Sequence, residues 1–394
     1  MHAFHALAGI TLLVALAWAL SEDRRGVRWR VVASGLALTV ALAGLLLAVP
    51  WLKGAVFSLN AGLVALERST QAGATFVFGF LAGGPAPYAE TNPPAAFVLA
   101  FRALPLVLVV SALSALLFHW RILPAVVRAF AWVLNKSMGL GGAVGVSAAV
   151  NVFVGMVEAP LVVKPYLAKL SRSELFMVMV CGMATIAGTV LALYGVILAP
   201  VVPDAIGHII VASFVATPAA IVVSALMVPG AMSDEAAIAI PRQDASAMDA
   251  ITRGTGEGAQ LLIQIVAMLI VLIALVHLVN AALSLAPAFG GEPLTLQRIL
   301  GWLFAPLAWT AGVPWEEARA GGALLGTKTI LNEFVAYVPL ARLPPEAMGP
   351  RSRLLMTYAM CGFANFGSLG ILIGGLGANV PQGRGPVGSV GVES

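Results

Sequence analysis

Two segments of the chain, RSELFMVMVCGMATIAG at residues 172–188 and RSRLLMTYAMCGFANFGS at residues 351–368, follow one pattern. Each opens with Arg-Ser, runs through an apolar stretch and reaches a Cys-Gly pair. Upstream of them, VNVFV at 150–154 and LNEFV at 331–335 share Asn-x-Phe-Val. Apolar identities are common by chance in a chain this rich in Leu, Ala and Val, whereas agreement at Asn, Arg-Ser and Cys-Gly is not. The sequence therefore predicts two related structural units.

Both units contain residues that interrupt helices. Pro160 and Pro165 lie in the first unit, and Pro339, Pro344 and Pro345 lie in the second. Each apolar stretch also carries two glycines at which a helix can unwind, namely Gly182 and Gly188 in the first and Gly362 and Gly367 in the second. Unwound backbone at membrane depth must face protein or a watery cavity. Repeats with discontinuous helices that meet at mid-membrane are typical of secondary transporters.

The composition of the chain places it in a membrane. Of its 394 residues, 60% are hydrophobic and 10% are charged, which leaves too little polar surface for a soluble protein of this size. Apolar stretches of roughly 20 residues are long enough to cross a bilayer as helices. We expect spans near 3–20, 31–50, 97–118, 174–199, 206–230, 259–287 and 352–377. The predicted fold class is an all-α polytopic membrane protein.

Basic residues gather in alternate connections between these spans. Four arginines follow the first span (Arg24, Arg25, Arg28 and Arg30), basic residues follow the third (Arg121, Arg128 and Lys136), and the intervening loop 51–96 sets Lys53 and Arg68 against Glu67 and Glu90. The positive-inside rule then predicts a multi-pass protein of the inner (plasma) membrane with its N-terminus outside. The net charge of +4 is therefore topological and does not indicate binding to nucleic acid.

Two hydrophilic segments lie between the apolar ones. Residues 122–139 mix basic and apolar residues at roughly helical spacing, which suits a helix at the cytoplasmic interface. Residues 231–257 carry charges of both signs and are expected to form a solvated connector.

Two carboxylates stand inside the apolar repeats: Glu158 in NVFVGMVEAPLVV and Glu333 in KTILNEFVAYVPL. An ionisable group at membrane depth costs at least ~2.5 kcal/mol and by default marks a functional site. The alternative is a structurally paired carboxylate, with Lys164 and Lys328 as nearby partners. We favour function because one acid occurs in each unit. A carboxylate aimed into a polar pocket accepts two hydroxyl hydrogen bonds, which suits a sugar-like substrate.

Amide and hydroxyl side chains accompany the acids. Asn151 and Asn332 occupy matching positions, where an amide can bind substrate, ligate a hard cation through oxygen or cap a broken helix. Thr185, Asn365 and Ser368 add further polar groups to the apolar stretches that follow.

Sequence signatures of catalysis are missing. The chain contains no HExxH, GxSxG or P-loop motif, and its five histidines are scattered without metal-ligand spacing. Both cysteines, Cys181 and Cys361, lie in apolar segments and predict no disulfide framework. We expect neither an enzyme nor an organic cofactor, and an intramembrane hydrolase built on Glu158 and Glu333 is the least favoured alternative.

Over nearly its whole length the chain resembles the concentrative nucleoside transporters. The resemblance is carried by NVFVGMVEAPLVVKPYLAKLSRSELFMVM (151–179), GMATIAG (182–188), GWLFAPLAWTAGVPWEEA (301–318), GTKTILNEFVAY (326–337) and CGFANFGSLGILIGGLG (361–377). It implies a homotrimer in membrane lipid, in which each protomer has a scaffold around a transport core of two inverted repeats. Each repeat would hold a re-entrant hairpin and a broken helix. The implied activity is uptake of nucleosides with sodium or protons by an elevator-like movement of the core.

On this resemblance the chain divides into four parts. These are scaffold helices with an interfacial helix (1–140), the first hairpin and broken helix (141–230), a hydrophilic connector with a long scaffold helix (231–310) and the second hairpin and broken helix (311–394). The family continues past Gly377 with another spanning helix, whereas PQGRGPVGSVGVES ends this sequence. The second repeat is therefore expected to lack the family's final helix.

The resemblance also assigns site residues by position. The implied substrate contacts are Glu158, Glu333, Asn365, Ser368, Phe363 and Val190, of which Glu333, Asn365 and Ser368 would hold the ribose and Val190 would touch the base. The implied sodium ligands are Asn151, Val154, Thr185 and Ile186, through side-chain and carbonyl oxygens.

Two positions depart from the family pattern. The family places a Gln and a Ser or Thr directly before the first hairpin acid, where they hydrogen-bond the nucleobase, whereas Met156 and Val157 stand here. Neither side chain reads a base edge, and a site that loses its polar partners loses discrimination. The expected substrate is a nucleoside bound with relaxed base choice. The alternative is another hydroxylated metabolite, carried by the same fold with protons.

Overall fold

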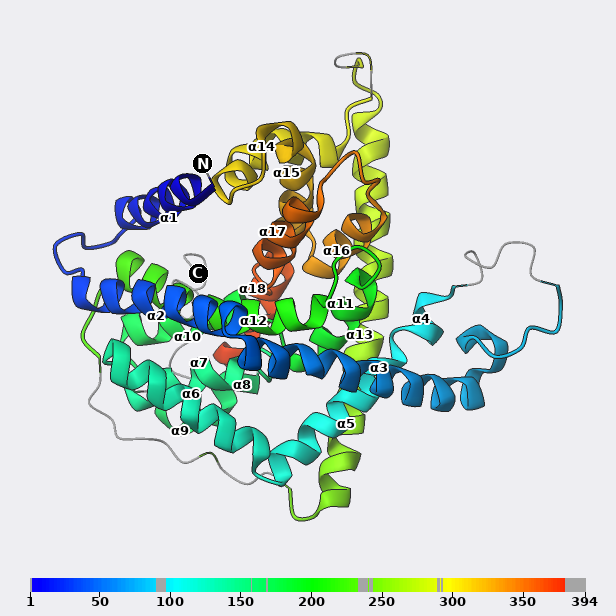
Figure 1. The fold of residues 1–394 in the computed structure, drawn as a ribbon, viewed down its shortest axis with the longest axis horizontal. Coiled ribbons are helices and arrows are strands. Elements are labelled where there is room, and N and C mark those ends of the chain that lie inside the picture. The colour runs from blue at the N-terminus through cyan, green and yellow to red at the C-terminus, as the bar shows by residue number, and fades with distance from the viewer. Residues whose placement is uncertain are drawn as a thin grey trace.

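The computed structural model describes residues 2–89, 97–156, 158–167, 169–232, 240, 244–288, 291 and 293–379. The described residues form helices and no strand (Figure 1). Helical stretches that are long and apolar enough to cross a membrane run over Trp29–Ala48, Leu99–His119, Arg172–Leu198, Ala205–Met227 and Ala247–Leu283. This is the all-α architecture that the composition predicts.

The first part of the chain supplies the helices that precede the two units. They are α1 (His2–Ala19), α2 (Trp29–Ala48), α3 (Pro50–Phe78), the 3-10 turn η1 (Gly79–Ala82), α4 (Leu99–Arg102), α5 (Pro105–His119) and α6 (Ile122–Met138). The spans expected at 3–20 and 31–50 correspond to α1 and α2. The span expected at 97–118 is divided between α4 and α5, because Pro105 has no N–H to continue a helix from α4.

The prediction of a loop over 51–96 was wrong for its first half, which forms α3. Pro50 lies in the first turn of α3, where a missing N–H costs nothing. The helix ends at Gly79, whose φ of 59° suits glycine and whose N–H donates to the carbonyl of Thr75. Charged and small residues lower the hydropathy of this helix, so it was not recognised as an apolar span. Its proline start and glycine end are nevertheless common signals of helix termini.

The helix expected at 122–139 is α6. Its C-terminus is closed by Gly139, whose φ of 66° lies in the left-handed region. Val127, Leu134 and Met138 are buried along one face, whereas Trp132 is exposed on another. This two-faced pattern fits a position at a membrane interface, as the sequence predicts.

The first unit is a hairpin followed by a broken helix. The hairpin contains α7 (Gly142–Asn151), α8 (Glu158–Val162) and α9 (Lys164–Leu167), and the broken helix consists of α10 (Arg172–Ala184) and α11 (Gly188–Leu198). A capping box between Ser171 and Glu174 starts α10. The chain is extended at Thr185 and becomes helical again from Gly188. α12 (Ala205–Met227) follows this unit.

The second unit repeats this order. After α14 (Leu296–Thr310), the hairpin helices are α15 (Trp315–Ile330) and α16 (Glu333–Arg342), and the broken helix consists of α17 (Pro350–Met360) and α18 (Phe366–Asn379). The predicted pair of hairpins and broken helices is therefore present. Residues 380–394, on which the expected loss of a final helix depends, lie outside the described residues.

The two breaks lie against each other. The N–H of Phe363 donates to the carbonyl of Thr185 at 3.3 Å, which joins unwound backbone of both units. Gly362 allows this approach, because a Cβ there would lie 2.8 Å from the carbonyl oxygen of Ala184. Polar backbone freed by one break is thus partly satisfied by the other, as unwound segments inside a membrane require.

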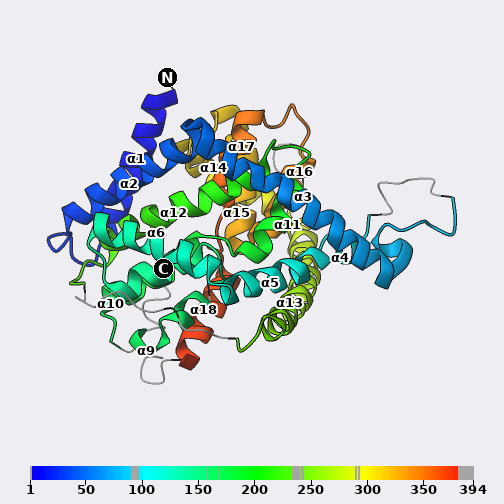
Figure 2. The same cartoon turned by 60° about the horizontal axis from the view of Figure 1, so that its bottom comes forward.

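The connector expected at 231–257 is shorter than predicted, because α13 (Ala247–Leu283) already begins at Ala247. Ser246 caps this helix by accepting from the N–H of Asp249 at 3.1 Å. α13 runs along one side of the molecule and lies beside α5 (Figures 1 and 2). Gly254 and Gly258 bring the two helices close, since a Cβ at Gly254 would lie 2.7 Å from that of Ala115.

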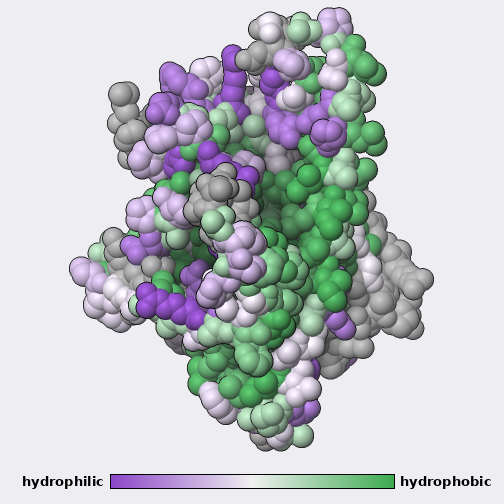
Figure 3. Space-filling view, turned by 90° about the vertical axis from the view of Figure 1, so that its right-hand side faces the viewer, coloured by the Kyte–Doolittle hydropathy of each residue, from purple (hydrophilic) through white to green (hydrophobic). Residues whose placement is uncertain are grey.

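The surface beside α13 is broadly hydrophobic (Figure 3). Along α13, the exposed apolar side chains include Ile263, Ile270, Val271, Ile273, Leu275 and Leu278. A soluble monomer rarely exposes so large an apolar patch, whereas lipid or another membrane chain covers one without cost.

Candidate functional site

A cavity of about 500 Å³ lies among the two units, α5 and α13. Its wall includes eight of the candidate site residues that the sequence singled out: Val154, Met156, Val190, Asn332, Glu333, Phe363, Asn365 and Ser368. These residues come from both hairpins and both broken helices, so the two units build one site. The volume falls within the range of small-molecule pockets.

Glu333 is the buried charge of this site. It is the first residue of α16 and is 4% exposed. Its Oε1 accepts a hydrogen bond from the Tyr194 hydroxyl at 2.7 Å, and its Oε2 accepts from Asn365 Nδ2 at 3.2 Å. The position at a helix N-terminus also favours the negative charge.

The lysine considered as a partner attracts the Glu333 carboxylate but forms no ion pair with it in the part of the chain that the structure describes. Lys328 is buried in α15, five residues earlier in the chain. Among the described residues, however, no lysine or arginine nitrogen lies within ion-pair distance of Glu333. The carboxylate is held by neutral donors that also face the cavity, as a substrate-binding group requires.

Asn365 is oriented by the start of α18. Its Oδ1 accepts the N–H of Ser368 at 2.8 Å, which turns its Nδ2 toward Glu333. The break in the second unit thus places the Asn365 amide and the Ser368 hydroxyl in the cavity wall, where Asn365 meets the Glu333 carboxylate of the hairpin.

The first hairpin contributes an apolar surface. Met156 lines the cavity and is 7% exposed. Val190 of α11 and Phe363 line it as well. Val157 lies outside the described residues, as does the side chain of Glu158, whose backbone begins α8.

Two of the predicted cation ligands, Asn151 and Thr185, are in contact. The Asn151 Nδ2 lies 2.6 Å from both the carbonyl oxygen of Cys181 and Thr185 Oγ1. Asn151 and Thr185 are 3% and 1% exposed, and Ile186 is fully buried beside them. Val154 lines the nearby cavity. The structure thus brings the hairpin residue Asn151 to the break that carries Thr185 and Ile186.

The donor set suits a hard monovalent cation. Asn151 Oδ1 is buried and has no hydrogen-bond partner among the described residues. Buried polar atoms are rarely left unpaired unless an ion or water completes them. Neutral amide, hydroxyl and carbonyl oxygens, such as those of Asn151 and Thr185, are ligands that hard cations accept.

Tyr194 is a site residue that the sequence analysis missed. It is 3% exposed, lines the cavity and follows Val190 by four residues, on the same face of α11. A buried tyrosine hydroxyl normally has a hydrogen-bond partner, so a tyrosine in the apolar run LALYGVIL was a usable signal.

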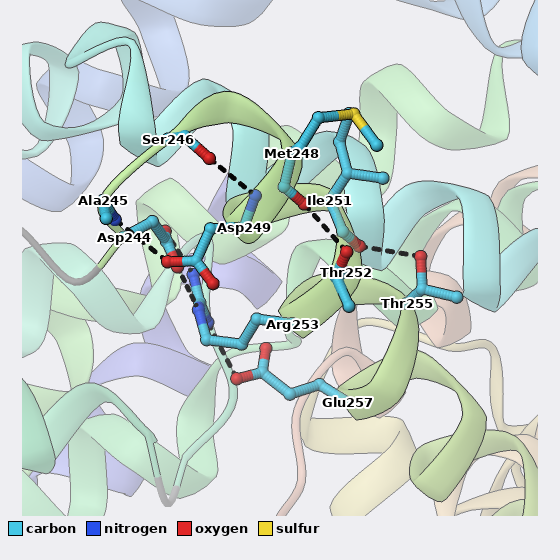
Figure 4. Close-up of polar contacts among 10 residues, drawn as sticks. All are labelled: Asp244, Ala245, Ser246, Met248, Asp249, Ile251, Thr252, Arg253, Thr255 and Glu257. Carbon is cyan, nitrogen blue, oxygen red and sulfur yellow. Dashed lines mark hydrogen bonds and ion pairs between the residues drawn. The ribbon is translucent and has the colours of Figure 1, made fainter.

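Two charged residues of α13, Arg253 and Glu257, line the cavity, and Figure 4 shows their polar contacts. Arg253 donates to both carboxylate oxygens of Asp244, at 2.6 and 2.9 Å, and to Glu257 Oε1 at 2.7 Å. The Arg253 guanidinium lowers the pKa of the Asp244 carboxyl through these hydrogen bonds. Charges that the sequence analysis treated as solvating therefore also shape the cavity.

Family models identify the chain along most of its length. They are described as Na+ dependent nucleoside transporter N-terminus (residues 8–81), nucleoside recognition (100–201) and Na+ dependent nucleoside transporter C-terminus (208–394). The Helicobacter pylori nucleoside permease NupC is 35% identical, covering 95% of this chain and 90% of the permease. Human sodium/nucleoside cotransporter 1 is 33% identical, covering 95% of this chain and 58% of the cotransporter.

Solved structures of CNTnw have the same fold. The inward-facing, substrate-bound state is 36% identical and covers all of this chain and 93% of that one, with a TM-score of 0.91. A doubly substituted variant in an outward-facing state also gives 0.91. The likeness confirms the predicted membrane fold, and it is equally strong for two different transport states.

Proposed function

The chain belongs to the concentrative nucleoside transporters, and from this membership we propose that it takes up nucleosides by symport with sodium. The observation that carries the proposal is the Glu333 carboxylate, buried in the cavity wall beside Asn365 and Ser368. Ribose presents vicinal hydroxyls, and a carboxylate accepts two such donors at once. The relatives and the fold are those of transporters, so the chain is not an enzyme.

The two walls of the cavity divide the nucleoside between them. Glu333, Asn365 and Ser368 hold the ribose, whereas Met156, Val190 and Phe363 offer the base an apolar surface. A surface without fixed donors and acceptors excludes few bases. We therefore expect purine and pyrimidine nucleosides to compete for one site, with Glu158 completing it from the first hairpin. A non-nucleoside solute is not favoured, because the family models and the named relatives are those of nucleoside transporters.

Sodium is the proposed coupling ion, and protons are the alternative. Membership in a sodium-dependent family supports sodium. In this chain Asn151 and Thr185 would supply side-chain oxygens and Val154 and Ile186 carbonyl oxygens. The atom that best suits a bound sodium ion is Asn151 Oδ1, which has no hydrogen-bond partner in the described parts of the chain.

The assembly and orientation follow the same family pattern. We propose a homotrimer in the inner membrane, with inverted repeats that move together inside the scaffold and an outside N-terminus. The loop after α1 supports this orientation. The N–H of Glu22 in this arginine-rich loop donates to the carbonyl of Met227, and Arg172 forms an ion pair with Glu22 at 2.6 Å. The arginine-rich loop after α1 therefore lies beside the end of α12 and the start of α10, and the positive-inside rule predicts that this side of the protein faces the cytoplasm.

Uptake into proteoliposomes tests the function. Radiolabelled uridine, cytidine, adenosine and guanosine would each be offered with an inward sodium gradient, with an inward proton gradient and with neither. We expect sodium-driven accumulation of uridine and competition by all four. Accumulation driven by the proton gradient and not by the sodium gradient would show that H⁺ is the coupling ion. If none of the four accumulates or competes, the nucleoside assignment is wrong.

A further inference from the structure

Tyr194 joins the two units at the buried carboxylate. It lies on α11 of the first unit, and its hydroxyl donates to Oε1 of Glu333, which begins α16 of the second unit, at 2.7 Å. Both residues are almost fully buried, at 3% and 4% exposure. This is the shorter of the two hydrogen bonds that Glu333 makes with the described residues.

The direction of the Tyr194 hydroxyl is fixed by packing. The ring lies 5.0 Å from that of Tyr337 and 6.2 Å from that of Phe334, both on α16. The ring therefore packs against the same helix that carries Glu333. A hydroxyl held in this way is a preorganised donor for the carboxylate rather than a group that a ligand must first attract.

A buried carboxylate is costly unless hydrogen bonds satisfy its oxygens. In a symport cycle the core crosses the membrane once with nucleoside and returns without it. The ribose hydroxyls are donors to Glu333 only in the first crossing. In the return the protein itself must supply the donors, or the charge opposes the movement.

We propose that Tyr194 is a positioning residue that stabilises the Glu333 carboxylate in the substrate-free core and so permits the empty core to recross the membrane. The proposal rests on the proposed function of the site as a ribose-binding site. It assigns to Tyr194 a role in the return step rather than in holding the nucleoside. The hydrogen bond between the units also keeps them together while they move.

The role predicts a distinctive pattern for Tyr194→Phe, which removes the hydroxyl and keeps the ring. A hydrogen bond to a charged group contributes enough that its loss corresponds to roughly ten- to a hundredfold in a rate or equilibrium constant. Because the substrate-free state loses more than the loaded state, net uptake slows. For the same reason the purified variant binds uridine more tightly than the wild type does.

Three measurements on the full chain make the test. Net uptake of labelled uridine is driven by a sodium gradient. Exchange is measured in vesicles preloaded with unlabelled uridine and equal sodium on both sides, so that the core crosses only when loaded. Equilibrium binding of uridine is measured in detergent. For Tyr194→Phe we expect net uptake to fall about tenfold or more and exchange by less than about twofold, with a lower Kd.

Tyr337→Phe is the matched control. Tyr337 is also fully buried, and its hydroxyl donates to the carbonyl of Thr357 at 3.0 Å instead of to Glu333. Its removal should change net uptake and exchange in equal proportion. Equal losses of uptake and exchange in Tyr194→Phe, no loss in either, or weaker uridine binding would each overturn the proposal. A wild-type protein that neither accumulates nor exchanges any nucleoside would instead refute the proposed function.

Discussion

The two units use matching residues for different tasks. Asn151 in the first hairpin reaches the break of its own unit, where it meets Thr185 and the carbonyl of Cys181. Asn332 in the second hairpin caps α16 by accepting the N–H of Val335 at 2.8 Å. Among the described residues, the side-chain oxygen of Asn151 is buried without a hydrogen-bond partner, whereas the side-chain oxygen of Asn332, which also lines the cavity, accepts from the helix backbone. Residues at matching positions of the two repeats therefore make different contacts.

The charges of the two units diverge in the same way. At the third position of the shared Arg-Ser motif, Glu174 closes the capping box of α10. Its counterpart Arg353 is buried and donates to the carbonyls of Leu343, Pro344 and Met348. The first residue stabilises the start of a helix, and the second holds the end of a hairpin. Under the proposed function, these differences mean that the first unit binds the cation and the second unit binds the ribose.

The largest effect is expected for Glu333→Gln. It removes the charge that receives the ribose hydroxyls, and loss of about two charge-assisted hydrogen bonds corresponds to at least ~100-fold in uptake. The measurement is sodium-driven uridine uptake, normalised to folded protein by size-exclusion chromatography. The control is Glu346→Gln, an exposed carboxylate between α16 and α17 of the same unit. Unchanged uptake in Glu333→Gln would contradict the proposal that the second unit binds the ribose.

Asn151→Ala tests the cation role of the first unit. We expect the sodium concentration for half-maximal uptake to rise about tenfold, because the site loses a neutral oxygen ligand. Asn332→Ala is the matched change in the second unit. It should cost about 1 kcal/mol of stability as a lost N-cap and leave the sodium dependence as it was. If both variants shift the sodium dependence equally, the proposed specialisation fails.

The combined change Met156→Gln and Val157→Thr tests whether the apolar wall of the cavity causes the relaxed choice of base. Restored polar groups before Glu158 should favour some bases over others, with discrimination rising roughly three- to tenfold for one or two neutral hydrogen bonds. Competition by the four nucleosides against labelled uridine measures it. Met248→Gln, at an exposed position on α13, is the control and should leave the competition order alone.

The smallest effect is expected outside both units, at Asp244→Asn. Arg253 lowers the pKa of Asp244, so the ion pair stabilises the fold above the usual aspartate pKa of about 3.9 and loses this contribution as the pH falls below it. At pH 7 the variant should be less stable by about 1 kcal/mol, because Asp244 is buried but the Arg253 side chain is 31% exposed and keeps its ion pair with Glu257. Thermal unfolding at pH 7 and near pH 3 tests this pH dependence, because the difference in stability between the variant and the wild type should shrink in acid. A difference that grows in acid would contradict it.

The repeated pattern predicted much of the fold because breaks in helices leave local marks. Gly188 and Gly362 lie at the two breaks and Pro344 and Pro345 follow the end of α16, whereas Pro339 lies within α16 and Gly182 within α10. The helix α3 was missed because apolar length was the criterion, and α3 is helical without being a long apolar run. The early start of α13 was missed for the same reason.

The cavity could be predicted only in part. The acid Glu333 was visible as a charge in an apolar segment, and Asn365 and Ser368 came with the family pattern. Tyr194 carried a usable local signal, a tyrosine in an apolar run, but its partner could not be predicted, because Glu333 is 139 residues away in the sequence.

The amino-acid sequence by itself determined that the chain is a helical membrane protein with two broken units and one acid in each, because hydropathy and helix interruption are properties of short segments. The tertiary structure decided which residues of those units meet. It joined Tyr194 to Glu333 and separated the tasks of Asn151 and Asn332. The physical reason is that hydrogen bonding of buried polar groups depends on where the two breaks come together, and only the packed chain sets that place.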